Sequence, residues 1–390
     1  MNFEEIKDQI RSFVKEELYT LEPWILNCEW EEKLPKLNEL REEVKRRGLW
    51  LPQVPKEYGG LGLSNAQHGE VSEILGGSPY GHYCFNCQAP DAGNMEILIE
   101  FGTEAQKETY LKPLLRGEIR SCFAMTEPNN AGSNPVKMSS TALKEGNEYV
   151  INGHKWFTSS CDGASFAIAM LVTDPDGDNR HERASQIIVP LDTPGFEFIR
   201  NVSIMGHPGG GWESHAEIKF NNCRVPLTNV LGEDGAGFAI AQKRLGPGRI
   251  HHCMRSIGLA EAALKLMCER SLEREAFGRP LAKLGGNVDI IAQARIEIEM
   301  TRLLCLKAAW LMDNVGTDAA QPFISMIKVA APNMALKIID EAMQMYGGLG
   351  LSQDTPLANW YGGQRVLRFA DGPDAVHRMV IGRRELKQYR

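Results

Sequence analysis

The spacing of apolar residues changes twice along the chain, and this change limits the fold more than any single motif. Up to about residue 120, apolar residues recur every three or four positions, as between Phe3 and Val14, which indicates amphipathic helices. From about 123 to 232, short β-branched and aromatic segments such as SFAIAMLVT alternate with turn sequences such as DPDGDN, which is typical of strands. Beyond about 233 the helical spacing returns in longer runs.

This order predicts an α+β chain of three domains. We expect an N-terminal α-helical domain at 1–121, a middle antiparallel β-barrel or sandwich at 122–232, and a C-terminal four-helix bundle at 233–390. A length of 390 residues suits two or three domains and is ample for a core without disulfides.

Charge and cysteine content narrow the possible partners and the compartment. With 43 Lys and Arg against 50 Asp and Glu, the net charge of −7 disfavours nucleic acid and an anionic membrane surface. Nine cysteines form an odd set without a disulfide pattern, which favours a reducing compartment. The N-terminus reads as neither a signal nor a transit peptide, and the run at 164–172 is too short to span a membrane. We therefore expect a cytoplasmic protein without an integral membrane segment.

The heptapeptide YGGLGLS occurs twice, at 58–64 and 346–352. Neither copy completes G-x-G-x-x-G, because Asn65 and Gln353 stand where the third glycine belongs, and neither follows a strand. A Rossmann dinucleotide site is therefore excluded. The first copy is typical of a glycine-rich turn after a helix, whereas the second can bring backbone amides close to a ligand.

The sequence contains little that indicates a metal site or a hydrolase active site. His82, Cys84 and Cys87 have a spacing that a metal could use, but no second Cys/His pair follows, so core positions are favoured over zinc ligands. The adjacent pair His251 and His252 lacks the i, i+4 spacing of helical ligands. No G-x-S-x-G, Walker or H-E-x-x-H motif is present, and we predict no metal site.

Three short segments carry more information. CFAMTEPNNAGSNP (122–135) places hydroxyls and small residues beside a strand, where they can bind a planar polar ring. HKWFTSS (154–160) adds a large aromatic residue with a threonine on the same face. Each segment alone could be a structural turn, but together with FADGPDAVHR (369–378) they indicate one site.

At this point the chain resembles the acyl-CoA dehydrogenase family over nearly its whole length. The matching motifs are MTEP with AGS, KWFT, VLGEDGAGF, EREAFGRPL and QMYGGLG, in the family's order. FNCQAPDAGNME and ADGPD further suggest a branch whose members handle longer or modified acyl chains.

The resemblance implies a bound FAD, held without a Rossmann fold, and a homodimer or homotetramer in which one subunit contacts its neighbour's cofactor. Three groups of positions match the family's FAD contacts. They are the middle-domain residues Phe123, Met125, Thr126, Gly132, Ser133, Trp156, Phe157 and Thr158; the cross-subunit residues Arg274, Phe277, Gln344, Gly347 and Gly348; and the C-terminal residues Pro373 and Asp374.

One departure concerns the catalytic base. The resemblance implies a glutamate in E-G-T, but this chain has Asp371 followed by Gly372 and Pro373. The alternative base position of some relatives is Gly248 here, which cannot serve. Asp371 is therefore the candidate base, with a capping or turn aspartate as the alternative, and we expect an apolar site to raise its pKa. The resemblance also implies substrate contacts by Ser133, Arg249 and Gly372.

The function implied is the α,β-dehydrogenation of a fatty acyl-CoA to the 2-enoyl-CoA, a step of fatty acid metabolism, with electrons passed to electron-transfer flavoprotein. Two alternatives stay open. A nitroalkane oxidase-like enzyme also uses an aspartate base but passes electrons to oxygen. A catalytically silent paralogue would bind FAD and acyl-CoA without turnover.

Overall fold

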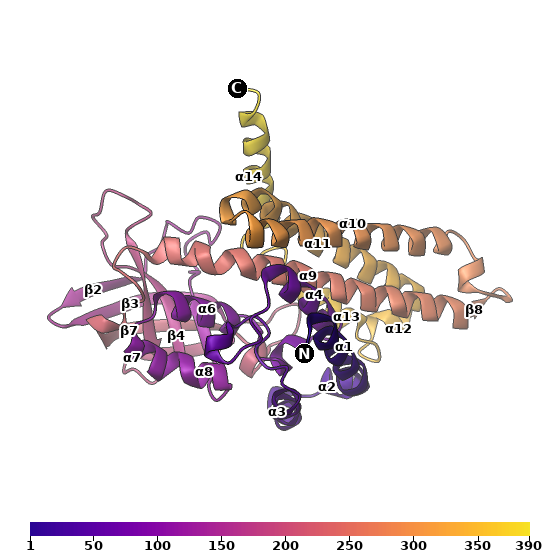
Figure 1. Ribbon diagram of the computed structural model, residues 1–390, viewed down its shortest axis with the longest axis horizontal. Helices are drawn as coiled ribbons and strands as arrows, with labels where there is room; N and C mark the ends of the chain where they lie inside the picture. Colours follow the sequence, from indigo (N-terminus) through magenta and orange to yellow (C-terminus); the bar gives the residue numbers. More distant parts are fainter.

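A curled seven-stranded sheet lies between two groups of helices in chain order (Figure 1). The computed structural model describes residues 1–390. The sheet occupies one end of the molecule and the long C-terminal helices extend to the other (Figure 1). This arrangement confirms the predicted fold class. The predicted domain limits fall within the first strand, after residue 121, and shortly before the first long helix.

The N-terminal part consists of short helices around an aromatic core. Phe13 and Phe85 meet edge to face with ring centres 5.3 Å apart, and Trp30 meets Tyr83 in the same way. The capping box of Asn2 and Glu5 starts the first helix by satisfying free amides. The helices are α1 (Phe3–Phe13), α2 (Tyr19–Ile25), α3 (Trp30–Arg46), α4 (Asn65–Gly76), α5 (Gly81–Cys84), α6 (Asp91–Phe101), α7 (Glu104–Gln106) and α8 (Lys112–Arg116).

The middle part is a mixed sheet that is mainly antiparallel. Its strands are β1 (Ser121–Ala124), β2 (Thr141–Glu145), β3 (Glu148–Ser159), β4 (Phe166–Val172), β5 (Ala184–Pro190), β6 (Phe196–Asn201) and β7 (His215–Pro226). The pairing of β1 with β4 is parallel, whereas β3 with β7, β4 with β5 and β6 with β7 are antiparallel. Six of the seven residues of β4 are buried, as a continuous apolar strand requires.

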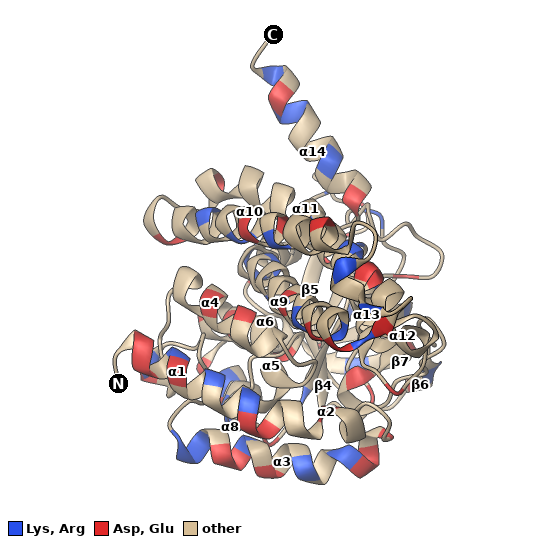
Figure 2. Cartoon of the chain, turned by 90° about the vertical axis from the view of Figure 1, so that its right-hand side faces the viewer, with Lys and Arg blue, Asp and Glu red and all other residues tan.

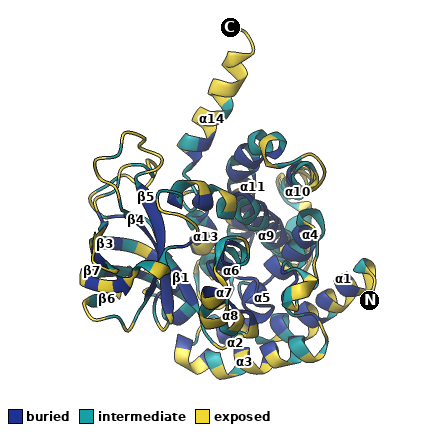
Figure 3. Ribbon diagram, turned by 60° about the vertical axis from the view of Figure 1, so that its left-hand side comes forward, coloured by how far each residue is buried: buried dark blue, intermediate teal, exposed yellow.

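Three long helices form the C-terminal bundle. These are α9 (Gly237–Glu273), α10 (Asn287–Asn314) and α11 (Thr317–Tyr346), and a short hairpin of β8 (Glu275–Ala276) and β9 (Arg279–Pro280) joins the first two. Their buried residues form one core with facing surfaces on α9 and α11 (Figure 3). By length and composition α11 could cross a membrane, but it packs against α9 and α10 as a core helix.

The chain ends in α12 (Gly348–Leu351), α13 (Leu357–Val366) and α14 (Asp374–Lys387). Only the first turn of α14 packs on the body, through Asp374 and His377. The remainder projects outward with exposed side chains, both charged ones such as Arg383 and apolar ones such as Leu386 (Figures 2 and 3). The turn that precedes α14 is therefore fixed at one end of a helix whose other end is free.

A buried carboxyl group connects the first and last parts of the chain. Glu22 of α2 accepts a hydrogen bond from Trp360 Nε1 of α13 at 3.0 Å. Burial raises the pKa of Glu22 to about 7, and the bond from Trp360 offsets only part of that rise. Glu22 is therefore partly protonated at neutral pH.

The Glu22 contact predicts a pH-dependent stability. A pKa above its ordinary value means that the folded state binds an extra proton, so stability is lost as the pH rises through about 7. Glu22→Gln keeps an acceptor for Trp360 and removes the charge. We expect this variant to be about 1–3 kcal/mol more stable than wild type at pH 8, with no advantage at pH 5. Thermal melts at both pH values test this, with the exposed Glu16→Gln as control. Equal shifts at both pH values would contradict it.

Candidate active site

The loop after β1 and the end of β3 meet at one edge of the sheet. The Trp156 backbone N–H donates to the Thr126 carbonyl at 3.1 Å, and Thr126 Oγ1 donates to the Trp156 carbonyl at 2.7 Å. A Cβ on Gly132 would lie 2.9 Å from Thr126 Cγ2, so this position must stay small for the loop to close. The structure thus brings the MTEP, AGS and KWFT segments together.

A buried ion pair holds this arrangement from behind. Lys155 Nζ lies 2.9 Å from Glu127 Oε1 and donates to the Met125 carbonyl at 2.9 Å. The other Glu127 oxygen accepts the backbone N–H of Ser139, and its Oε1 also accepts that of Ser140. Burial raises the pKa of Glu127, but Lys155 and these donors lower it to about 2. The pair therefore fixes the loop after β1, and the segment of Ser139 and Ser140 that precedes β2, to strand β3.

The edge beside Thr126 has features that fit a planar, hydrogen-bonding cofactor. Thr158 Oγ1 is buried and has no hydrogen-bond partner. Phe157, with φ of 48°, sits at an irregularity of the β3–β7 register and stays 42% exposed. A buried hydroxyl without a partner next to an exposed aromatic ring is an arrangement that a bound ring system would complete.

Two further predicted cofactor residues lie near this edge. Phe123 is half-buried, and the Arg244 guanidinium of α9 stacks over its ring at 4.3 Å from the centre. Ser133 is exposed in the loop that follows β1. Phe123 thus connects the sheet to α9, whereas Ser133 is free to meet a ligand.

The turn of Asp371 lies against α9, α11 and α14. The Asp371 carbonyl accepts from Arg249 Nε at 3.0 Å and from His377 Nε2 at 3.3 Å. Lys328 Nζ donates to the carbonyls of Leu367 and Ala370 at 2.6 and 2.8 Å. Asp371 itself has φ of 55°, a conformation that non-glycine residues adopt only where the surroundings impose it.

The carboxylate of Asp371 lies among cationic side chains, and the expected rise in its pKa is wrong. Burial raises the pKa, but the positive charges of His252, Arg244, Arg249 and Lys328 more than offset it, so the net shift is downward. Because burial lowers the pKa of His252 to about 3, we attribute the effect mainly to the arginines and Lys328. Asp371 is therefore ionised at neutral pH.

Asp374, the next carboxyl group, has a structural role. Its Oδ2 accepts from Arg368 Nε at 2.8 Å and from Asn333 Nδ2 at 3.1 Å in the first turn of α14. Pro373 precedes it as the N-cap, and a Cβ on Gly372 would lie 2.9 Å from His377 Nε2. Of the two aspartates, Asp371 is the one whose carboxylate receives no such bonds.

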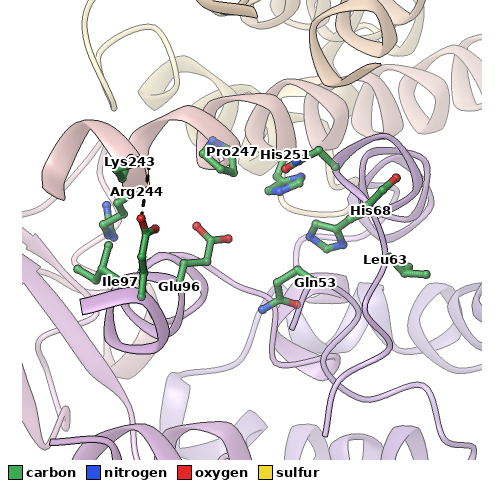
Figure 4. Close-up of a pocket in the computed structure, with 12 residues that line it drawn as sticks. Gln53, Leu63, His68, Glu96, Ile97, Lys243, Arg244, Pro247 and His251 are labelled. Atoms are coloured by element: carbon green, nitrogen blue, oxygen red, sulfur yellow. Dashed lines mark ion pairs between the residues drawn. The ribbon is translucent and has the colours of Figure 1, made fainter. Parts of the chain in front are cut away.

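A polar cavity of about 270 Å³ borders α9 at Arg244, whose charge also acts on Asp371. Only two of its 12 lining residues are hydrophobic. Glu96 of α6, Arg244 and His251 of α9, His68 of α4 and Gln53 surround the space (Figure 4). Burial and Glu100 raise the pKa of Glu96 to about 7, although Arg244 opposes this shift.

A second cavity of about 160 Å³ lies between the sheet loops and the start of α9. Arg180, His181 and Arg183 provide a basic rim, and Pro135 and Phe238 provide apolar walls. The His181 and Phe238 rings pack with their centres 4.9 Å apart. Such a site suits an aromatic base that carries phosphate groups.

The remaining predicted cofactor residues lie at the far end of the bundle. Phe277, at the β8–β9 hairpin, is 94% exposed and Arg274 is exposed beside it. The Arg270 guanidinium lies 5.1 Å from the Tyr346 ring centre, which places the end of α9 next to the end of α11 with Gln344, Gly347 and Gly348. Figure 1 shows this end opposite the sheet, so one chain does not bring the two groups together.

Comparison with known proteins assigns the family. Three domain models match in sequence: acyl-CoA dehydrogenase N-terminal domain at residues 2–118, middle domain at 122–223 and C-terminal domain at 235–386. "Probable acyl-CoA dehydrogenase FadE2" of Mycobacterium tuberculosis is 47% identical over 91% of this chain and 86% of its own length. The chain belongs to the acyl-CoA dehydrogenase family. Membership places it among oxidoreductases that act on CH–CH bonds.

Other relatives are longer than this chain. "Acyl-CoA dehydrogenase family member 10" of Mus musculus is 46% identical over 97% of the chain, which spans 36% of that protein. Among solved structures, an acyl-CoA dehydrogenase-like protein from Mycobacterium abscessus has a TM-score of 0.95 at 44% identity, covering 100% of this chain and 98% of the other. A solved structure described as "Electron transferring flavoprotein of Acidaminococcus fermentans: Towards a mechanism of flavin-based electron bifurcation" contains a chain with a TM-score of 0.84 at 29% identity, with 98% of this chain and 97% of that chain covered.

Sequence reasoning missed the charged side chains around Asp371. Lys328 interrupts the apolar stripe of α11 between Ile327 and Ala331, and a buried lysine in such a stripe was the available signal. His252 was weighed only as a metal ligand. Arg244 carried no signal, because the helical period alone does not tell which polar residues face a neighbouring helix.

The predicted FAD residues at the sheet and those at the far end of the bundle are too far apart to bind one cofactor within a single chain. This separation predicts a cross-subunit contact with FAD. If Arg274 reaches the pyrophosphate of a neighbour's FAD, Arg274→Ala removes a charged partner and weakens cofactor retention by about tenfold or more. FAD content after gel filtration at decreasing protein concentration measures this, with the exposed hairpin variant Arg279→Ala as control. A monomer that keeps FAD tightly would contradict the cross-subunit contact.

Proposed function

We propose that this protein is an FAD-dependent acyl-CoA dehydrogenase that converts an acyl-CoA to the 2-enoyl-CoA. The observation that carries the proposal is the ionised carboxylate of Asp371, fixed in a strained turn beside the space that Gly248 leaves open. A Cβ on Gly248 would lie 4.0 Å from Asp371 Oδ2, so α9 presents no side chain there. A thioester α-carbon can approach the carboxylate along this side.

The residues of the turn can share the chemistry of α-proton removal. Asp371 is ionised and can accept the proton without first losing one. Its own backbone N–H has no partner within the chain and is free to donate to the thioester oxygen as negative charge develops. Arg244, Arg249 and Lys328 add positive potential without occupying the carboxylate. FAD, when bound, accepts the hydride from the β-carbon.

The loop after β1 and the end of β3 would hold the flavin ring. Thr126 and Thr158 offer hydroxyl groups, and Trp156 and Phe157 offer aromatic surface, their ring centres being 4.7 Å apart. The orphaned hydroxyl of Thr158 supports this assignment. We infer that electrons then pass to electron-transfer flavoprotein, as the structural likeness to the Acidaminococcus fermentans chain supports.

The basic cavity near Arg180 would receive the nucleotide end of coenzyme A. Its aromatic wall suits the adenine, and its basic rim suits the phosphates. The loop that contains Ser133 leads into this cavity through Pro135. Ser133 would then lie between the proposed flavin and coenzyme A sites.

The polar cavity beside Arg244 refines the substrate class. A saturated fatty acyl chain gains free energy from apolar walls, whereas this cavity is lined by carboxyl, imidazole and guanidinium groups. Buried nitrogens of His68 and His251 in its wall have no hydrogen-bond partner. We infer that the acyl group carries a hydrogen-bonding substituent that these groups would bind.

Anaerobic reduction of the flavin tests the activity and this refinement together. We expect acyl-CoAs that carry a polar group on the chain to bleach the flavin at least about tenfold faster than unsubstituted chains of equal length. Flavin absorbance under anaerobic stopped flow is the measurement. Bleaching by a nitroalkane with peroxide production would instead indicate the oxidase, and bleaching by dithionite alone would indicate a silent paralogue.

Replacement of the base gives the second test. Asp371→Asn should still bind FAD and be reduced by dithionite, because the carboxylate faces the substrate side. Reduction by the best acyl-CoA should fall by about 10²–10⁴-fold, the usual contribution of a positioned base. Asp374→Asn is the matched comparison, since that carboxylate is engaged by Arg368 and Asn333. A rate near wild type for Asp371→Asn would refute the assignment.

A further inference from the structure

The imidazole of His252 approaches the Asp371 carboxylate from α9. His252 Nε2 lies 3.4 Å from Asp371 Oδ2, the closest approach of a basic side chain to this carboxylate. Arg249 and Lys328 bind backbone carbonyls of the turn instead. The two side chains of this pair are 17% and 20% exposed, so water competes little for the contact.

The protonation state of His252 determines what it can offer. Burial and the nearby Arg255 lower the pKa of His252 to about 3, although Asp371 opposes this shift, so the ring is neutral. A neutral imidazole carries one N–H, on either nitrogen. A bare Nε2 would set its lone pair against the carboxylate, so the anion favours the tautomer with the proton on Nε2.

The helix around His252 is fixed independently of Asp371. Ser256 Oγ donates to the His252 carbonyl at 2.9 Å and accepts from Gln364 Nε2 at 2.8 Å. Both Ser256 and Gln364 are buried. These bonds join α9 to α13, the helix that leads into the Asp371 turn, and so set the distance between the imidazole and the carboxylate.

We propose that His252 is a positioning residue whose Nε2–H holds the Asp371 carboxylate in its reactive orientation. The backbone of the turn is bound from three helices, but the aspartate side chain can still rotate, and Gly248 leaves one side of it open. His252 lies one turn further along the same face of α9 than Gly248, and its Nε2 approaches the same oxygen, so an N–H there limits that rotation. This inference rests on the proposed function, because it concerns the same base.

Three substitutions of His252 distinguish the effect of its N–H donor from the effect of its side-chain shape. His252→Gln can place an amide N–H near the position of Nε2, His252→Asn carries the same amide on a shorter side chain, and His252→Leu has no donor. We expect Gln to keep flavin reduction within about threefold of wild type. Asn and Leu should lose about 10- to 100-fold in the reduction rate with little change in KM, as for a lost hydrogen bond to a charged group. FAD content and dithionite reduction should be unchanged in all three.

The pH profile distinguishes positioning from a packing role. Loss of the N–H raises the pKa of Asp371, so the acid limb of the reduction rate should move up by about one unit in Leu and Asn but not in Gln. The other charged groups around Asp371 stay constant in this series; they are Arg244, Arg249 and Arg255 of α9, Lys328 of α11, and Asp374 and His377 of α14.

A measurement without turnover keeps the test independent of the proposed activity. Infrared titration of protein with 13C-labelled aspartate, with Asp371→Asn as the blank, reports the Asp371 carboxyl directly. The same one-unit rise in His252→Leu supports the contact even if no acyl-CoA reduces the wild-type flavin, an outcome that would refute only the proposed function. Wild-type titration in His252→Leu, or equal loss of rate in Gln and Leu, would overturn the positioning role.

Discussion

The turn of Asp371 is bound through its backbone carbonyls, and the candidate site depends on this constraint. Arg249, Lys328 and His377 come from three different helices, and each donates to a carbonyl between residues 367 and 371. Buried carbonyls need such partners, so the donors satisfy the turn and fix its position at once. The carboxylate itself is left without a full hydrogen bond. The site thus combines a rigid backbone with a side chain that is free to react.

Arg249 and Lys328, together with Arg244, also determine the electrostatics of the proposed reaction. Their charges keep Asp371 ionised, which makes it a weaker base than a carboxylate in an apolar pocket. Removal of an α-proton, however, moves negative charge toward the thioester oxygen, and nearby cations stabilise that charge. A reduced basicity of Asp371 is therefore offset by stabilisation of the developing oxyanion. Two arrangements can therefore balance the basicity of the carboxylate against stabilisation of the oxyanion. One is an aspartate surrounded by cations, and the other is a glutamate in an apolar pocket.

The sequence predicted the features that depend on local residue patterns. It did not predict the features that depend on which distant residues come close together in the folded chain. The change from helical to strand spacing predicted the order of helices, sheet and helices, since each period is set by residues a few positions apart. The MTEP and KWFT segments were recognised by resemblance, and the structure joins them through Thr126 and Trp156. The cations around Asp371 come from α9 and α11, which are distant in sequence. Their charge decided the direction of the pKa shift, and the expectation of an apolar site was wrong for that reason.

The separation of the two groups of predicted FAD residues bears on assembly. Thr158 offers an unpartnered hydroxyl at the sheet, while Phe277 offers a bare aromatic ring at the opposite end of the bundle. An exposed phenyl ring is costly unless something covers it, and a buried hydroxyl is costly unless something binds it. Under the proposed function one cofactor would satisfy both, with the ring system on one chain and the extended part on its neighbour. Each cofactor would then bridge two chains, so cofactor binding and association would stabilise each other by mass action.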